Sequence, residues 1–227
     1  MLLHYVREVE RLRALLLSLS AAVEENLRKA VDSVMQRDQT LATQVIDKDR
    51  EIDLLEVDVE EECLKILALH QPVANDLRFI VAALKINNDL ERIGDLAVNI
   101  AERTIFLSTL SMPQTSFDFP GMAEKAQAMV QNSLDAMLNQ DLELAESVRA
   151  SDDEVDEINR AMYEQIKEGI RKEPDRINAL IHLLSISRHL ERVADHATNI
   201  AEDVIYMIKG EIVRHHWQER EQEHPSA

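Results

Sequence analysis

Acidic and amide side chains recur at helical spacing in two places along this chain. The first set consists of Glu91, Asp95, Asn99 and Glu102, and the second consists of Glu191, Asp195, Asn199 and Glu202. Successive members are four, four and three residues apart, which places each set on one face of an α-helix. Carboxylate and amide oxygens are the ligands that hard or borderline cations such as Mg²⁺, Mn²⁺, Ca²⁺ and iron prefer. Each set is therefore a candidate metal site.

The two sets belong to an internal repeat. Residues 90–102 and 190–202 lie 100 positions apart and are identical at nine of thirteen positions. A helix that needed only a packing surface would keep an apolar stripe, whereas here the polar residues are kept as well. The pattern indicates a site that is used twice in one chain.

A second pair of acidic residues accompanies each set. Asp49 and Asp53 precede the first set, and Asp152 and Asp156 stand at the corresponding place, 103 residues later, before the second. Like charges four residues apart destabilise a helix by roughly 0.2–0.5 kcal/mol. Four such pairs at equivalent places indicate that something offsets the repulsion, and a bound cation is one candidate.

Ordinary ion pairs are the other candidate. Arginines stand three or four residues from one aspartate of each pair, in the combinations Arg50 with Asp53, Arg92 with Asp95, Arg160 with Asp156, and Arg192 with Asp195. Pairs of this kind are common on helix surfaces and contribute little to stability. The residues alone leave both interpretations open.

Composition and charge limit the function. The chain has 227 residues and a formal net charge of −18, which disfavours binding to nucleic acid or anionic lipid. The sequence contains neither the Gly-x-x-x-x-Gly-Lys-Ser/Thr motif nor the Gly-x-Gly-x-x-Gly motif of nucleotide-binding proteins. The Glu-x-x-His pairs of di-iron bundles are missing from the expected helices. The single cysteine, Cys63, excludes an internal disulfide and is expected in the core. No apolar run is long enough to span a membrane.

The elements that must carry these residues are helices. Only four glycines and five prolines interrupt a chain with long 3.6-residue periodicity. The pattern predicts an all-α fold of two homologous three-helix bundles in tandem, related by a pseudo-twofold axis, with a linker at 111–120 and repeats at 1–112 and 113–227. The expected helices span 4–37, 41–70, 73–110, 121–139, 142–171 and 175–209.

With these motifs in place, the chain resembles the PhoU family. The resemblance rests on an Asp-x-x-x-Asp motif on the second helix of each bundle and a Glu-Arg-Ile/Val-x-Asp-x-Ala-x-Asn-Ile motif on the third. It covers about residues 5–210. The second copy departs from the first at Arg188, which stands where the first has Asn88.

The resemblance implies a cytoplasmic, commonly dimeric accessory protein that is not an enzyme. Such proteins link the ATPase subunit of a phosphate transporter to a sensor histidine kinase, and they repress phosphate-starvation genes when phosphate is plentiful. Contact with the membrane would occur only through these partners. The family binds metal ions on its acidic surfaces, so iron, zinc, manganese or magnesium is expected here. The ligands carried over are Asp49, Asp53, Glu91, Asp95, Asp152, Asp156, Glu191 and Asp195, with Asn99, Glu102, Asn199 and Glu202 as additional candidates.

Three functions therefore compete. The first is a metal-dependent regulatory adaptor of phosphate uptake, and the second is an oxygen- or metal-handling enzyme in a helical bundle. The third is a helical protein-interaction module without a functional metal. The absent Glu-x-x-His pairs weigh against the enzyme.

Overall fold

The computed structural model describes residues 2–114, 117–211 and 213, and these residues form six α-helices and one short 3₁₀ helix without any β-strand. His215 and His216, which follow the last expected helix and could bind a transition metal on residue type alone, lie outside the described part. None of the helices within it carries an apolar segment long enough to cross a membrane. The elements in chain order are α1 (Leu2–Gln36), α2 (Gln39–His70), α3 (Asn75–Thr109), α4 (Phe119–Asn139), α5 (Leu142–Lys172), η1 (Pro174–Arg176) and α6 (Ile177–Lys209).

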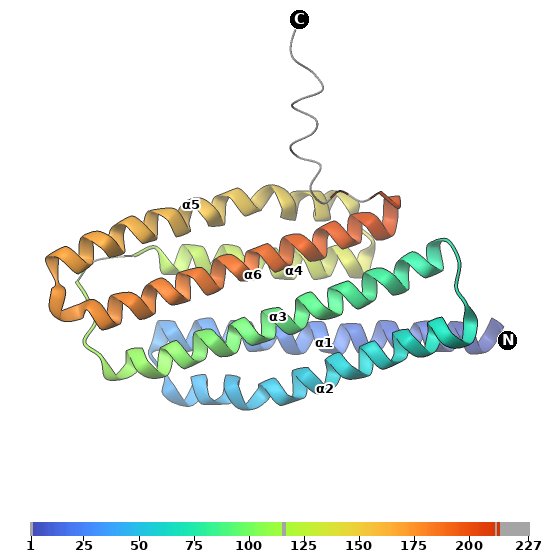
Figure 1. The fold of residues 1–227 in the computed structure, drawn as a ribbon, viewed down its shortest axis with the longest axis horizontal. Coiled ribbons are helices and arrows are strands. Elements are labelled where there is room, and N and C mark those ends of the chain that lie inside the picture. The colour runs from blue at the N-terminus through green and yellow to red at the C-terminus, as the bar shows by residue number, and fades with distance from the viewer. Residues whose placement is uncertain (1, 115–116, 212, 214–227) are drawn as a thin grey trace, which may run out of the picture.

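The helices form two three-helix bundles that lie side by side (Figure 1). Helices α1, α2 and α3 pack together in the first bundle, and α4, α5 and α6 pack together in the second. The bundles meet where α3 contacts α6 and where α1 contacts α4. The predicted fold class is confirmed. The predicted boundary between residues 112 and 113 falls in the connection from α3 to α4.

Apolar residues at helical spacing explain why these segments are helices that pack. On α1 the buried side chains include Leu12, Leu16, Leu19, Val23 and Leu27, which recur every three or four residues. Among the described helices, α3 and α6 bury the largest numbers of residues, because each packs against its own bundle and against the other bundle. The third helix of each repeat is thus central, and it carries the longer acidic motif.

Aspartate caps fix where several helices begin. Asp38 accepts hydrogen bonds from the backbone N–H groups of Thr40 (2.8 Å) and Leu41 (3.1 Å), and this confirms the predicted break between the first two helices. The predicted start of α4 at residue 121 was two residues late, because Asp118 caps the helix by accepting from the Gly121 N–H (3.1 Å).

The expected start of the third helix at residue 73, directly after Pro72, was wrong. The sequence places this proline in the first turn of the third helix, whereas α3 begins at Asn75. Gln71 and Ala74, on either side of the connection, have positive φ angles of 47° and 51°. Gln71 is in the left-handed helical region, and the two residues with positive φ turn the chain before the helix begins. Pro72 therefore indicated the break between α2 and α3 correctly, but it did not indicate the first residue of α3.

Gly94 allows the close approach of α3 to α2. A methyl group added at Gly94 would lie 3.2 Å from Cγ2 of Ile52. In the second repeat the corresponding residues are Ala194 and Val155, so one methyl group is added on the third helix and one is removed on the second. The total packed volume is therefore similar in the two bundles.

This exchange predicts strong coupling between the two positions. Gly94→Ala alone should stabilise the helix by about 1 kcal/mol through higher helix propensity. The displacement of Ile52 by the new methyl group should cancel this gain. Combined with Ile52→Val, the alanine should fit and the protein should be more stable than the sum of the single variants predicts. A double-mutant cycle measured by urea unfolding tests this. Strict additivity of the two changes would contradict it.

Candidate functional site

The predicted ligands of the first repeat come together on one surface of α2 and α3. We call Asp49, Asp53, Glu91 and Asp95 the first acidic stripe. Burial raises the pKa of Asp49, and the charges of Asp53 and Asp95 raise it further. Burial also raises the pKa of Glu91, and Asp95 adds to this effect while Arg92 opposes it. Carboxylates on α2 and on α3 raise one another's pKa values, which like charges do only at short range. The two helices therefore hold these carboxylates close together.

The second repeat builds a matching second acidic stripe from Asp152 and Asp156 on α5 and Glu191 and Asp195 on α6. Burial raises the pKa of Asp152, with a further contribution from Asp195 across the helix pair. The pKa values of Glu191 and Asp195 are raised by burial and then by neighbouring carboxylates of the same stripe. The two repeats therefore share not only these residues but also the raised pKa values of their carboxylates.

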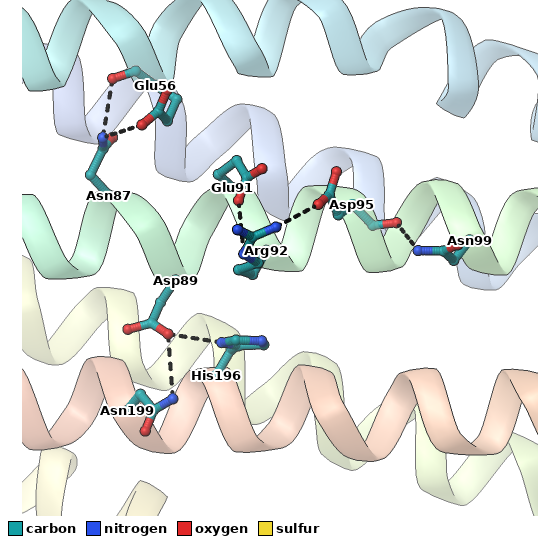
Figure 2. Close-up of polar contacts among 9 residues, drawn as sticks. All are labelled: Glu56, Asn87, Asp89, Glu91, Arg92, Asp95, Asn99, His196 and Asn199. Carbon is teal, nitrogen blue, oxygen red and sulfur yellow. Dashed lines mark hydrogen bonds and ion pairs between the residues drawn. The ribbon is translucent and has the colours of Figure 1, made fainter.

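Sequence reasoning missed Glu56 in the first repeat. It lies one turn after Asp53 on α2, and its pKa is raised by burial and by the charges of Glu60 and Asp53. Asn87 of α3 donates a hydrogen bond to its Oε1 (3.2 Å; Figure 2). The counterpart of Glu56 in the repeat is Asn159, so a comparison of the two halves for shared acids passed over it. The spacing 49, 53, 56 along one helix face was the signal available.

The arginine ion pairs form only in part. Arg92 contacts Glu91 at 3.3 Å and Asp95 at 3.2 Å, as Figure 2 shows, and Arg160 contacts Asp156 at 3.8 Å. In the described chain Arg50 and Arg192 make no ion pair with their aspartates. The stripes are therefore only partly neutralised by the protein's own cations.

The four additional candidates are placed less uniformly. The Asn99 amide donates to the backbone oxygen of Asp95 (2.8 Å), and Glu102 is exposed. In the second repeat Asn199 turns towards α3 and donates to Asp89 (3.3 Å), and Glu202 contacts Arg149 at 3.5 Å. Asn199 and Glu202 are thus engaged elsewhere, and neither extends its stripe in this conformation.

The donor set suits a hard cation. The stripes present carboxylate oxygens that repel one another, and a cation between them would relieve that repulsion. No three His, Cys, Asp or Glu side chains in the described ranges are gathered closely enough to hold one ion. The stripes are therefore open surfaces, on which water or a partner's side chain would complete the coordination of a metal.

The repulsion predicts an unusual pH dependence of stability. A carboxyl group whose folded pKa is raised binds a proton more readily when folded, so its penalty is fully present at pH 7 and is relieved as pH falls through the folded pKa. The metal-free protein should therefore gain stability as the pH falls from 7 towards the ordinary Asp and Glu pKa values of 3.8 and 4.5, with the gain beginning above those values. Urea unfolding of the parent and of a Glu91→Gln/Asp95→Asn/Glu191→Gln/Asp195→Asn variant should show a smaller gain in the variant. Equal gains would contradict the account.

Two further residues have clear positions. Cys63 is fully buried, and burial raises the pKa of its thiol to about 12, which fits the predicted core role. His196, which stands where the first repeat has Leu96, contacts the buried Asp89 of α3 through Nδ1 (2.8 Å; Figure 2). It links the two bundles.

Comparisons with known proteins agree with this architecture. The family model described as the PhoU domain matches the chain twice, at residues 16–104 and 119–204. A phosphate-specific transport system accessory protein PhoU homolog from Aquifex aeolicus is 39% identical over 92% of this chain and 95% of that protein. A homolog of the same name from Pseudomonas aeruginosa is 38% identical, over 92% of this chain and 86% of that protein.

Solved structures show the same likeness. The crystal structure of PhoU from Pseudomonas aeruginosa superposes with a TM-score of 0.89 and 36% identity, covering 91% of this chain and all of that one. The phosphate transport system regulatory protein PhoU from Streptococcus pneumoniae superposes with a TM-score of 0.81 and 30% identity, covering 92% and 99%. With two matching domains and close relatives along most of its length, the chain belongs to the PhoU family.

Proposed function

We propose that this chain is an accessory regulatory protein of a phosphate-specific transport system and acts as an adaptor, without catalysis of its own. The phosphate-specific transport system is named in the descriptions of relatives whose similarity to this chain extends over most of its length. The observation that carries the mechanism is the pair of acidic stripes, whose carboxylates raise one another's pKa values in both repeats.

In this proposal metal ions bound on the stripes determine how the adaptor docks. Iron, zinc, manganese and magnesium are the candidates, because all four accept carboxylate oxygens. A cation on an open stripe keeps free coordination positions, which a partner's side chains can occupy. The partners proposed are the transporter's ATPase subunit and a sensor histidine kinase, and the outcome is repression of the phosphate-starvation response. The adaptor would act in the cytoplasm as a homodimer.

The experiment is a binding and repression assay on stripe variants. Glu91→Gln/Asp95→Asn should weaken metal-dependent binding to the ATPase subunit and relieve repression in cells that contain plentiful phosphate. Replacement of the exposed Glu24 and Glu124 with Gln removes the same charge and should leave both intact. Normal binding and repression by the stripe variant would refute the metal-dependent mechanism.

A second candidate is an interaction module whose stripes work without metal. The contacts from Arg92 to Glu91 and Asp95 favour it, because they show one stripe partly neutralised from within. It predicts that partner binding survives removal of metal by a chelator, whereas the first candidate predicts its loss.

A further inference from the structure

Three basic side chains meet at one end of the contact between α3 and α6 without an acidic partner. Arg103 comes from α3, and His182 and His189 come from α6. Arg103 Nε, His182 Nδ1 and His189 Nδ1 are buried and have no hydrogen-bond partner in the described chain. Phe106 lies one turn after Arg103 on α3 and its ring stacks on His182, which places Arg103 beside that stretch of α6. In agreement with this position, the charge of Arg103 adds to burial in lowering the pKa values of both imidazoles.

The other end of the same contact is built with acids. There Lys85 contacts Asp203 (3.1 Å), and Asp89 accepts from Asn199 and pairs with His196. The repeat relates these acids to the basic cluster, because residue 203 corresponds to Arg103 and residue 89 to His189. Asp203 and Asp89, which pair with basic groups at one end of the contact, thus correspond to the basic residues Arg103 and His189 at the other end.

Buried polar nitrogens without a hydrogen-bond partner destabilise the folded protein. A ligand that forms hydrogen bonds with these nitrogens would remove that cost. A cation is disfavoured, because the Arg103 guanidinium is always charged and Arg192 also adds its charge near His189. An anion would accept hydrogen bonds from the guanidinium fork and from a neutral imidazole N–H. Arginine matches the oxygen atoms of phosphate in a bidentate manner.

We propose that Arg103, His182 and His189 form a binding site for a small tetrahedral oxyanion of the phosphate class. The ring of His182 stacks on Phe106 with centroids 5.1 Å apart, and 52% of Phe106 is exposed. His182 is itself partly exposed, so the cluster reaches the surface beside that ring, where an ion can enter. None of its residues belongs to either acidic stripe.

The test is a titration of the metal-free protein with inorganic phosphate by calorimetry at constant ionic strength. Phosphate should bind the parent with one site per chain, and Arg103→Gln should weaken binding at least about tenfold through loss of a charge-assisted hydrogen bond. Arg28→Gln is the matched control, since Arg28 is exposed, lies on α1 and pairs with Asp32. It removes the same charge and should bind as the parent does.

Two additional variants keep the result decisive. His189→Asn should also weaken binding, and Arg103→Gln should melt no lower than the parent in the absence of phosphate, because it removes an unpaired cation. The variant with both stripes neutralised should still bind phosphate, which separates this site from phosphate held by a metal on a stripe. Absence of binding to the parent, or equal binding by parent and Arg103→Gln, would overturn the proposal.

Discussion

Addition of a divalent metal to the metal-free protein should raise its melting temperature by roughly 5–10 °C for each occupied stripe. A ligand that binds only the native state at 100 times its Kd stabilises that state by about 2.7 kcal/mol. For a chain of this size each kcal/mol corresponds to about 2–4 °C. Differential scanning calorimetry with Mg²⁺, Mn²⁺, Zn²⁺ and Fe²⁺ in turn measures the rise.

The variant Glu91→Gln/Asp95→Asn/Glu191→Gln/Asp195→Asn should lose this rise. It should also melt higher than the parent when both are metal-free, because amides do not repel one another. The matched control replaces four exposed acids outside the stripes with Gln, namely Glu10, Glu24, Glu124 and Glu157. It should keep the metal-dependent rise. A rise that persists in the stripe variant would place the metal elsewhere.

Asp89→Ala should be the most destabilising single polar substitution between the two bundles. Asp89 is only 6% exposed and accepts from His196 and Asn199 of α6, as Figure 2 shows. Its removal leaves both partners without an acceptor at a buried contact, at a cost of roughly 3 kcal/mol. Urea unfolding measures the loss.

Two comparisons test the cause of that loss. Combination with His196→Leu, which restores the residue found at the equivalent position Leu96, should recover part of the lost stability. Asp32→Ala breaks an exposed pair with Arg28 and should change stability little. A loss as large for Asp32→Ala as for Asp89→Ala would show that burial of the contact is not the reason.

The helices and the stripes were predictable because both depend on local periodicity. The 3.6-residue pattern fixed the helix faces, and the repeat marked which acids share a face. Even so, the pattern could not fix helix starts, since Pro72 lies in a turn shaped by Gln71 and Ala74. Backbone geometry at a connection depends on how the two helices pack.

The contacts that the sequence pattern did not predict all join elements distant in sequence. Glu56 belongs beside the first stripe, but its repeat partner is Asn159. Glu202 matches the helical spacing of its stripe, yet it contacts Arg149 of α5. Asn199 and His196 turn to α3, which no spacing within α6 reveals. A repeat shows what two halves share, and these contacts are where the halves differ.

Metal content tests the central claim most directly. The protein should be purified without a His tag or chelator and analysed for bound elements beside the Glu91→Gln/Asp95→Asn/Glu191→Gln/Asp195→Asn variant. The account predicts stoichiometric metal in the parent and none in the variant. Metal absent from both, or retained by the variant, would contradict the assignment of the acidic stripes as metal sites.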